Sequence, residues 1–106
     1  MEFLRWLLRT RRRLTVTGAS MFPILKPDDQ ILYDRGAYRR RRPRAGDIVV
    51  SHHPQGEDFK VIKRVVRIHP DGRLDLQGEN PFESTDFNGV DPGKIIGRVT
   101  SIFFTN

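Results

Sequence analysis

The chain of 106 residues contains no cysteine. It therefore has no disulfide, no thiolate metal site and no cysteine nucleophile. It also lacks the roughly 20 consecutive apolar residues that a membrane span needs. The apolar stretch Phe3-Leu4-Arg5-Trp6-Leu7-Leu8 is interrupted by Arg5 and too short for a signal-peptide core. We expect a soluble chain in the cytoplasm without a transmembrane segment, and a peripheral contact with a membrane stays open.

Positive charge exceeds negative charge, with 19 Lys and Arg against 13 Asp and Glu and a net charge of +6. The arginines form two clusters, Arg9 with Arg11 to Arg13, and Arg39 to Arg42 with Arg44. Such clusters bind nucleic acid or anionic membranes, or simply keep a small protein soluble. Only Tyr38 adjoins the second cluster, whereas nucleic-acid modules usually add stacking aromatic residues. We therefore expect no specific nucleic-acid partner.

The hydrophobic pattern predicts an all-β fold. Residues 2–13 fit a short basic amphipathic helix, which would cover one end of the core or lie on anionic lipid. From Leu14 onward the period changes to two, and turns separate short apolar runs. The sequence predicts one domain, 1–106, with residues 14–106 as a barrel or sandwich. Expected strands cover 14–17, 30–34, 47–51, 59–68, 73–76 and 95–104, with loops at 35–46, 52–58 and 77–94 and a hairpin turn at 69–72.

One serine stands in a distinctive turn, Val16-Thr17-Gly18-Ala19-Ser20-Met21-Phe22-Pro23. Glycine permits close backbone approach and proline fixes the direction in which the chain leaves. This combination would expose the Ser20 hydroxyl at the end of a short apolar strand. Serine beside glycine and proline is also an ordinary turn residue, so the turn alone leaves both interpretations open.

A serine nucleophile needs a base, and the three histidines offer no clear partner. His52 and His53 precede Pro54 in a polar connector, and His69 lies in a turn. Neighbouring residues of an extended chain point apart, so His52 and His53 do not form a metal site. The chain also lacks a Gly-x-Ser-x-Gly elbow. We expect the histidines to be surface residues.

Lysine is the alternative base, and the run from Phe59 to Val65 separates its two lysines. Alternation places Lys63 on an apolar face and Lys60 beside Arg64 on the other face. Burial disfavours the ammonium form and lowers a lysine pKa toward the range of a general base. The alternative is a lysine whose stem packs while its amine reaches water. The pattern leaves these two interpretations equal.

Several motifs in order resemble the type I signal peptidase family, whose members are serine proteases with a Ser–Lys dyad. The resemblance covers most of the chain, from about Leu14 to Val99. The motifs are Val16 to Pro23, Gly46-Asp47-Ile48-Val49-Val50, Val61-Ile62-Lys63-Arg64-Val65-Val66, and Gly78-Glu79-Asn80 followed by Ser84-Thr85-Asp86. Within the family the chain is similar to small members that mature nickel-type superoxide dismutase. The fold implied is the β-barrel that signal peptidases share with LexA-like proteins.

The resemblance implies a role for each matched residue. Ser20 matches the nucleophile, Lys63 the general base, Ser84 a serine that orients the lysine, and Asp86 a supporting carboxylate. Residues Gly18, Ala19, Ser20 and Met21 would form the oxyanion and substrate-binding turn. No cofactor or metal is implied. The partner would be a precursor protein, the nickel-type superoxide dismutase precursor, whose N-terminal extension binds as an added strand.

The sequence departs from the family pattern in three places. Glu79 stands where the family often has aspartate, and Phe87 and Asn88 follow Asp86 where it often has serine and arginine. Gly18 stands where some members carry a serine of the oxyanion hole, so stabilisation would depend on backbone N–H groups.

Two rival functions stay open. A LexA-like self-cleaving regulator would need a DNA-binding domain before the serine, and only nineteen residues precede Ser20. A non-enzymatic basic module would bind RNA or a membrane surface through the arginine clusters.

Overall fold

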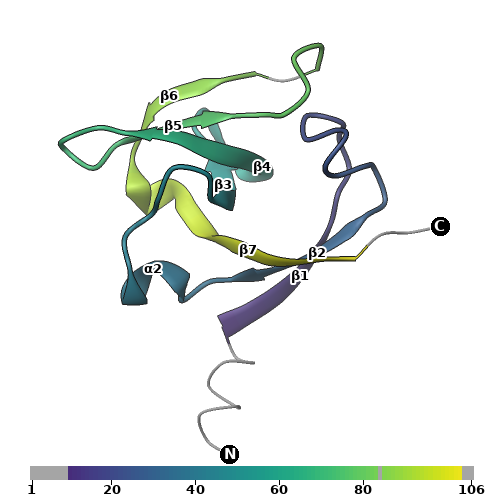
Figure 1. The fold of residues 1–106 in the computed structure, drawn as a ribbon, viewed down its shortest axis with the longest axis horizontal. Coiled ribbons are helices and arrows are strands. Elements are labelled where there is room, and N and C mark those ends of the chain that lie inside the picture. The colour runs from purple at the N-terminus through teal and green to yellow at the C-terminus, as the bar shows by residue number, and fades with distance from the viewer. Residues whose placement is uncertain (1–9, 84, 104–106) are drawn as a thin grey trace, which may run out of the picture.

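The computed structural model describes residues 10–83 and 85–103. These residues form one antiparallel sheet of seven strands in the order β1-β2-β7-β3-β4-β5-β6. The expected antiparallel all-β fold is confirmed, and Figure 1 shows the sheet curled, with β6, β5 and β4 across the interior from β2 and β1. The elements are β1 (Arg11–Thr15), β2 (Gln30–Asp34), α2 (Ala37–Arg40), β3 (Ile48–His53), β4 (Gly56–Ile68), β5 (Leu74–Gln77), β6 (Phe87–Val90), the 3₁₀ turn η1 (Pro92–Lys94) and β7 (Ile95–Phe103).

Strand β3 has both faces buried. Val49 and Val50 are adjacent and fully buried, and they belong to two different core clusters. Successive strand residues point to opposite faces, so a continuous apolar run buries both sides of the strand. Val50 packs with residues of the turn that carries Ser20, Met21 and Leu25, while Val49 packs with Val65 of β4. The sheet therefore places the serine turn and the lysine strand on one shared framework.

The expected hairpin after β4 is confirmed. β4 pairs with β5 in antiparallel register through Ile68 and Leu74. Gly72 has a φ of 92°, a backbone conformation that glycine adopts without steric cost. The Nε2 atom of His69 lies 2.7 Å from Oδ1 of Asp75 across this turn. The hydrogen bond to His69 is the main cause that holds the pKa of Asp75 below its usual value.

The prediction for the start of the chain is wrong where the structure tests it. Arg11, Arg12 and Arg13 were assigned to a helix over 2–13, but they begin β1 and pair with Asp34, Tyr33 and Leu32 of β2. Pairing with β2 satisfies the backbone N–H and C=O groups on one edge of this strand, and Arg12 and Arg13 extend their charged side chains into solvent. Residues 2–9 of that prediction lie outside the described residues.

Three expected loops contain regular structure. The segment 35–46 includes the single helical turn α2, in which Ala37 is 3% exposed, so this segment is partly packed. The connector 52–58 is a tight turn, because β3 runs to His53 and pairs with Gly56 of β4. The segment 77–94 holds β6 and η1, and β6 pairs with β5 through Phe87 and Leu76. These short elements were not predicted, because the glycine and proline residues in these segments are typical of loops.

No helix of the described chain is both long enough and apolar enough to cross a membrane.

Candidate active site

The turn that carries Ser20 is anchored in the core. At its base Val16 N–H donates to the Asp29 carbonyl over 2.8 Å, and Asp28 N–H donates to the Val16 carbonyl over 2.8 Å. Met21 is 2% exposed, and Leu25 is fully buried. Ser20, between these anchors, is partly exposed. A partly exposed serine on a packed turn is held in place yet open to a ligand.

A cleft of about 370 Å³ brings the two predicted catalytic residues together, because both Ser20 and Lys63 line it. Gly18 and Met21 also line the cleft, whereas Ala19 does not. One wall consists of residues 14–18, and the opposite wall consists of residues 60–63 of β4. The remaining lining residues come from the ends of β3 and β6 and the segment before β6: His53, Glu83, Thr85 and Phe87.

Lys63 is buried, as its position on the inner face of β4 predicts. Its side chain is 3% exposed, and the residue pairs with Val49 in the centre of the sheet. Burial lowers the pKa of the Lys63 amine, and the nearby charge of Asp86 partly opposes this effect. An amine that loses its proton more easily than an exposed lysine is suited to accept a proton from a hydroxyl. The alternative of a lysine reaching into water is therefore disfavoured.

An aromatic pair covers one side of Lys63. The amine nitrogen lies 5.5 Å from the ring centre of Phe87. The ring of His53 packs edge-on against Phe87, with ring centres 4.9 Å apart. The expectation that His53 is a loop residue is wrong, because it ends β3 and is half-buried in the cleft. Phe87, which departs from the family pattern, thus contacts the residue that matches the general base.

Lys60 is not as distant from the cleft as its alternation suggests. It is exposed, and it also lines the cleft with Ser20 and Lys63. Strict alternation would place Phe59 on the same face as Lys63, but Phe59 is 69% exposed. The alternation of β4 therefore holds at Lys63 and Val65 but not at the start of the strand. The choice between the two lysines depends on burial.

Asn80, which was not predicted as a site residue, holds the serine turn through two hydrogen bonds. Its backbone N–H donates to the Ser20 carbonyl over 2.8 Å. Its side-chain Nδ2 donates to the Ala19 carbonyl over 3.0 Å. The Gly78-Glu79-Asn80 motif was the available signal, because an asparagine in a loop can donate and accept at the same time.

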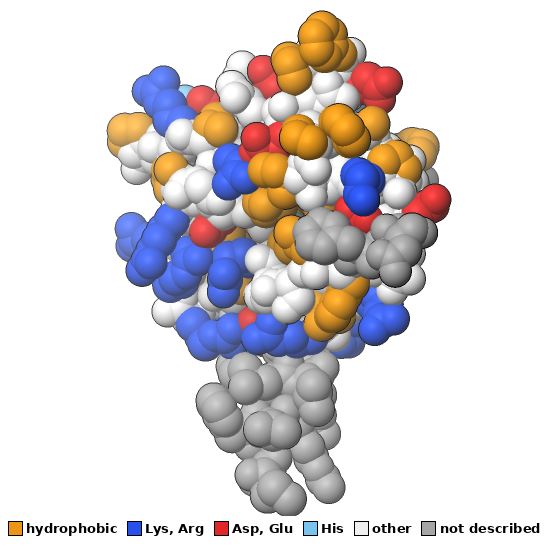
Figure 2. Space-filling view, turned by 45° about the vertical axis from the view of Figure 1, so that its right-hand side comes forward, with side chains coloured by type: hydrophobic (Ala, Val, Ile, Leu, Met, Phe, Trp, Pro, Cys, Tyr) orange, Lys and Arg blue, Asp and Glu red, His pale blue; other side chains and the backbone are white. Residues whose placement is uncertain are grey.

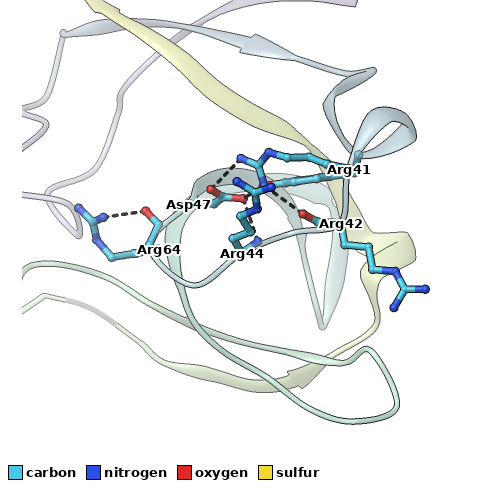
Figure 3. A network of polar contacts seen from close by, with 7 residues as sticks. Arg41, Arg42, Arg44, Asp47 and Arg64 are labelled. Carbon is cyan, nitrogen blue, oxygen red and sulfur yellow. Dashed lines mark hydrogen bonds and ion pairs between the residues drawn. The ribbon is translucent and has the colours of Figure 1, made fainter.

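A polar network links the other motif residues behind the cleft. Arg64, next to Lys63, donates to the Gly46 carbonyl over 2.8 Å and pairs with Glu79, next to Asn80. Figure 3 shows the carboxylate of Asp47 beside the guanidinium of Arg41, from which it accepts two hydrogen bonds, each 3.1 Å long. Burial opposes ionisation of Asp47, but hydrogen bonds from Arg41, Tyr38 and the Arg44 N–H hold its pKa below the usual value. The motifs are therefore structural neighbours.

Of the two predicted supporting residues, Asp86 and Ser84, the structure describes only Asp86. Asp86 is exposed and close enough to Lys63 for its charge to act on the amine. Among the described residues Asp86 forms no ion pair with an arginine, as the departure at Asn88 suggests. Ser84 lies outside the described residues. No cluster of three or more potential metal ligands occurs in the part of the chain that the structure describes.

Comparison with known proteins identifies the family. A family model described as signal peptidase, peptidase S26, matches residues 7–80. Mitochondrial inner membrane protease subunit 2 of Danio rerio is 33% identical over 113 residues, which cover 84% of this chain and 62% of the relative. Mitochondrial ATP-independent inner membrane protease subunit 1b of Arabidopsis thaliana is 32% identical over 107 residues, covering 77% and 63%. Signal peptidase I of Aquifex aeolicus is 36% identical over 52 residues, covering 49% and 20%.

The chain spans less than two thirds of the length of these relatives. The matched segment nevertheless contains the serine turn, the lysine strand and the Asn80 tether. The chain therefore belongs to the signal peptidase family, peptidase S26.

Proposed function

We propose that this chain is a serine endopeptidase that removes an N-terminal segment from a precursor protein, with Ser20 as nucleophile and Lys63 as general base. The observation that carries the proposal is the buried Lys63, with its lowered pKa, in the same cleft as Ser20. A serine hydroxyl becomes an effective nucleophile only when a base takes its proton. Family membership supports a peptidase rather than another use of the pair.

The reaction follows the acyl-transfer logic of serine proteases. Neutral Lys63 accepts the Ser20 proton, and the serine oxygen attacks the scissile carbonyl. The ammonium then donates that proton to the leaving amine, and water releases the acyl group with Lys63 again as base. Backbone N–H groups of residues 18–21, chiefly that of Ser20, would stabilise the oxyanion. Asp86 would balance the ammonium, and Ser84 would orient it.

An extended substrate fits the two walls of the cleft. β1 is at the end of the strand order, and among the described residues it pairs only with β2. On the other wall, β5 begins to pair with β4 only at Arg64, beyond the cleft-lining residues 60–63. An unpaired edge is a template for an added strand. The precursor would therefore lie between residues 14–18 and β4, with the bond to be cut at Ser20.

For the substrate we propose the precursor of nickel-type superoxide dismutase, because the motifs resemble those of its maturation proteases. Two relatives have inner membrane protease in their names, so we extend the proposal to a peripheral membrane contact from the cytoplasmic side. Cell fractionation tests the location, and a protein absent from both the cytoplasm and the membrane surface would contradict it.

The test is co-expression with the candidate precursor, followed by N-terminal sequencing of the product. We expect cleavage by the natural chain and by Lys60→Ala, and loss of cleavage in Ser20→Ala and Lys63→Ala. Lys60 is the matched control, because both lysines line the cleft but only Lys63 is buried. Cleavage that needs Lys60 and not Lys63 would overturn the assignment. An internal cut in the isolated chain would favour a self-cleaving regulator.

A further inference from the structure

A second hollow lies at the opposite end of β1 from the serine turn. Its volume is about 240 Å³, and it is lined by Thr10, Arg12, Arg35, Gly36 and Arg39. All three arginines are exposed. Figure 2 shows a band of Lys and Arg side chains along the lower part of the molecule, at the height of the start of β1 and of α2 in Figure 1. The hollow is therefore part of a positive surface.

The carboxylate of Asp34, beside Gly36 of the hollow, is already paired. Asp34 is fully buried, pairs with Arg40 and accepts the Gly36 N–H over 2.8 Å. No described Asp or Glu is among the lining residues. Three arginines thus line a space to which the other described lining residues, Thr10 and Gly36, contribute no negative charge, and Arg12 also donates to the Arg11 carbonyl over 2.9 Å. Arginine presents paired N–H donors that match a carboxylate.

Strand β1 connects this hollow to the cleft. Leu14 of β1 lines the cleft, and Arg12 lines the hollow two residues earlier on the same strand. At the strand rise of about 3.3 Å per residue, this separation is about 7 Å. Arg12 and Leu14 also share a face, because side chains alternate along a strand. A peptide that extends along the open edge of β1 from the cleft would reach the hollow.

We propose that the hollow of Arg12, Arg35 and Arg39 binds a carboxylate side chain of the same peptide that occupies the cleft. This proposal rests on the proposed function, because it assumes that the substrate extends along β1. Arg12 precedes Ser20 by eight positions, so for a substrate that follows this segment in extended form the acidic residue would lie roughly seven or eight residues from the scissile bond. The chain would thus select precursors with aspartate or glutamate at that distance.

The first measurement is of binding and needs no catalysis. Two fluorescent peptides span the cleavage site and extend eight residues to either side of it. One has Glu and the other Gln at the seventh and eighth residues counted from the scissile bond on each side. Fluorescence anisotropy with Ser20→Ala gives their dissociation constants at low and high salt. We expect the Glu peptide to bind about tenfold tighter, with the advantage reduced by salt. Equal or undetectable binding of the two peptides overturns the proposal.

Substitution then locates the effect. In the Ser20→Ala background, Arg12→Gln with Arg39→Gln should abolish the preference for Glu. The control, Arg67→Gln with Arg73→Gln, removes the same two charges from exposed arginines outside the hollow and should preserve the preference. An equal loss in both variants would mean a long-range charge effect and would overturn the site. The site would also be overturned if the double variant lost binding to RNA or to anionic vesicles but kept its preference for the Glu peptide.

Cleavage of the same peptides separates this proposal from the proposed function. With Ser20 intact, the Glu peptide should have a lower KM than the Gln peptide at a similar kcat, since the contact is remote from the reacting bond. Cleavage without any preference for Glu would refute the carboxylate site in the hollow but not the peptidase activity. Peptide binding that depends on Arg12 and Arg39, with no cleavage, would support the carboxylate site and refute the peptidase activity.

Discussion

Replacing Asn80 is the sharpest test of how the serine turn is held. Asn80→Ala removes the bond from Nδ2 to the Ala19 carbonyl and the bond that Oδ1 accepts from the Phe82 N–H over 3.0 Å. The bond from the Asn80 N–H to the Ser20 carbonyl stays available. A typical hydrogen bond contributes about 1 kcal/mol net, so we expect a loss of about 1–2 kcal/mol in unfolding free energy. The turn would shift without unfolding.

The effect on catalysis should be larger than the effect on stability. A displacement of about 1 Å in a reacting group costs about 100-fold in rate. We expect kcat/KM on a precursor peptide to fall about 10- to 100-fold in Asn80→Ala, mainly through kcat. Asn80→Asp should lose at least as much, because it places a carboxylate oxygen against the Ala19 carbonyl. Urea unfolding and steady-state kinetics provide the two measurements.

Asn88 supplies the matched control, because it is an exposed asparagine of β6. Asn88→Ala should leave both quantities near their natural values. If Asn80→Ala lowered the unfolding free energy but left kcat/KM within about twofold, the tether would be structural only, and the positioning argument would be refuted.

Three further predictions follow from burial and space. Because burial lowers the pKa of Lys63, the unfolded chain binds this proton more tightly than the folded chain does. The Lys63 contribution therefore makes stability rise with pH toward the usual pKa of 10.5. Lys63→Met should remove that slope in urea unfolding measured across this pH range, and an unchanged slope would refute the burial effect. Gly18→Ser should raise kcat/KM about tenfold by adding an oxyanion donor, because a Cβ there meets no described atom within 4 Å, and unchanged or lower activity would contradict this. Gly97→Ala should cost about 1–3 kcal/mol in thermal or urea unfolding, because its Cβ would lie 2.5 Å from the Asp34 carbonyl oxygen, and unaltered stability would contradict that close strand contact.

The sequence predicts most where packing and alternation agree. The apolar run at Val49 and Val50 predicted a strand, and the turn ending at Gly72 predicted the β4–β5 hairpin, because both signals are local. The strand at Arg11 to Arg13 was missed because an edge strand places charged side chains in solvent as readily as a helix does. β6 was missed because four residues between glycine-rich turns carry too short a pattern.

The site was predictable in its two central residues and not in their surroundings. Lys63 was identifiable as a charge on an apolar face, and the structure shows it buried. The opposition of residues 14–18 and 60–63 across a cleft depends on how a seven-stranded sheet curls, which no local pattern specifies. The contacts of Asn80 with Ala19 and Ser20 span about sixty residues of sequence, which places them beyond any periodicity argument.

The departure at Phe87 gives Lys63 an apolar neighbour in this chain. A serine at that position would place a small polar side chain beside the amine, whereas the Phe87 ring lies 5.5 Å from it and is backed by His53. An aromatic face attracts the ammonium by about 0.5–2 kcal/mol, which raises a lysine pKa, but the same ring excludes water, which lowers it. Burial is the larger effect at Lys63, and the charge of Asp86 opposes it. Phe87 therefore acts chiefly as an apolar cover over one side of the amine, while the charge of Asp86 favours its protonated form.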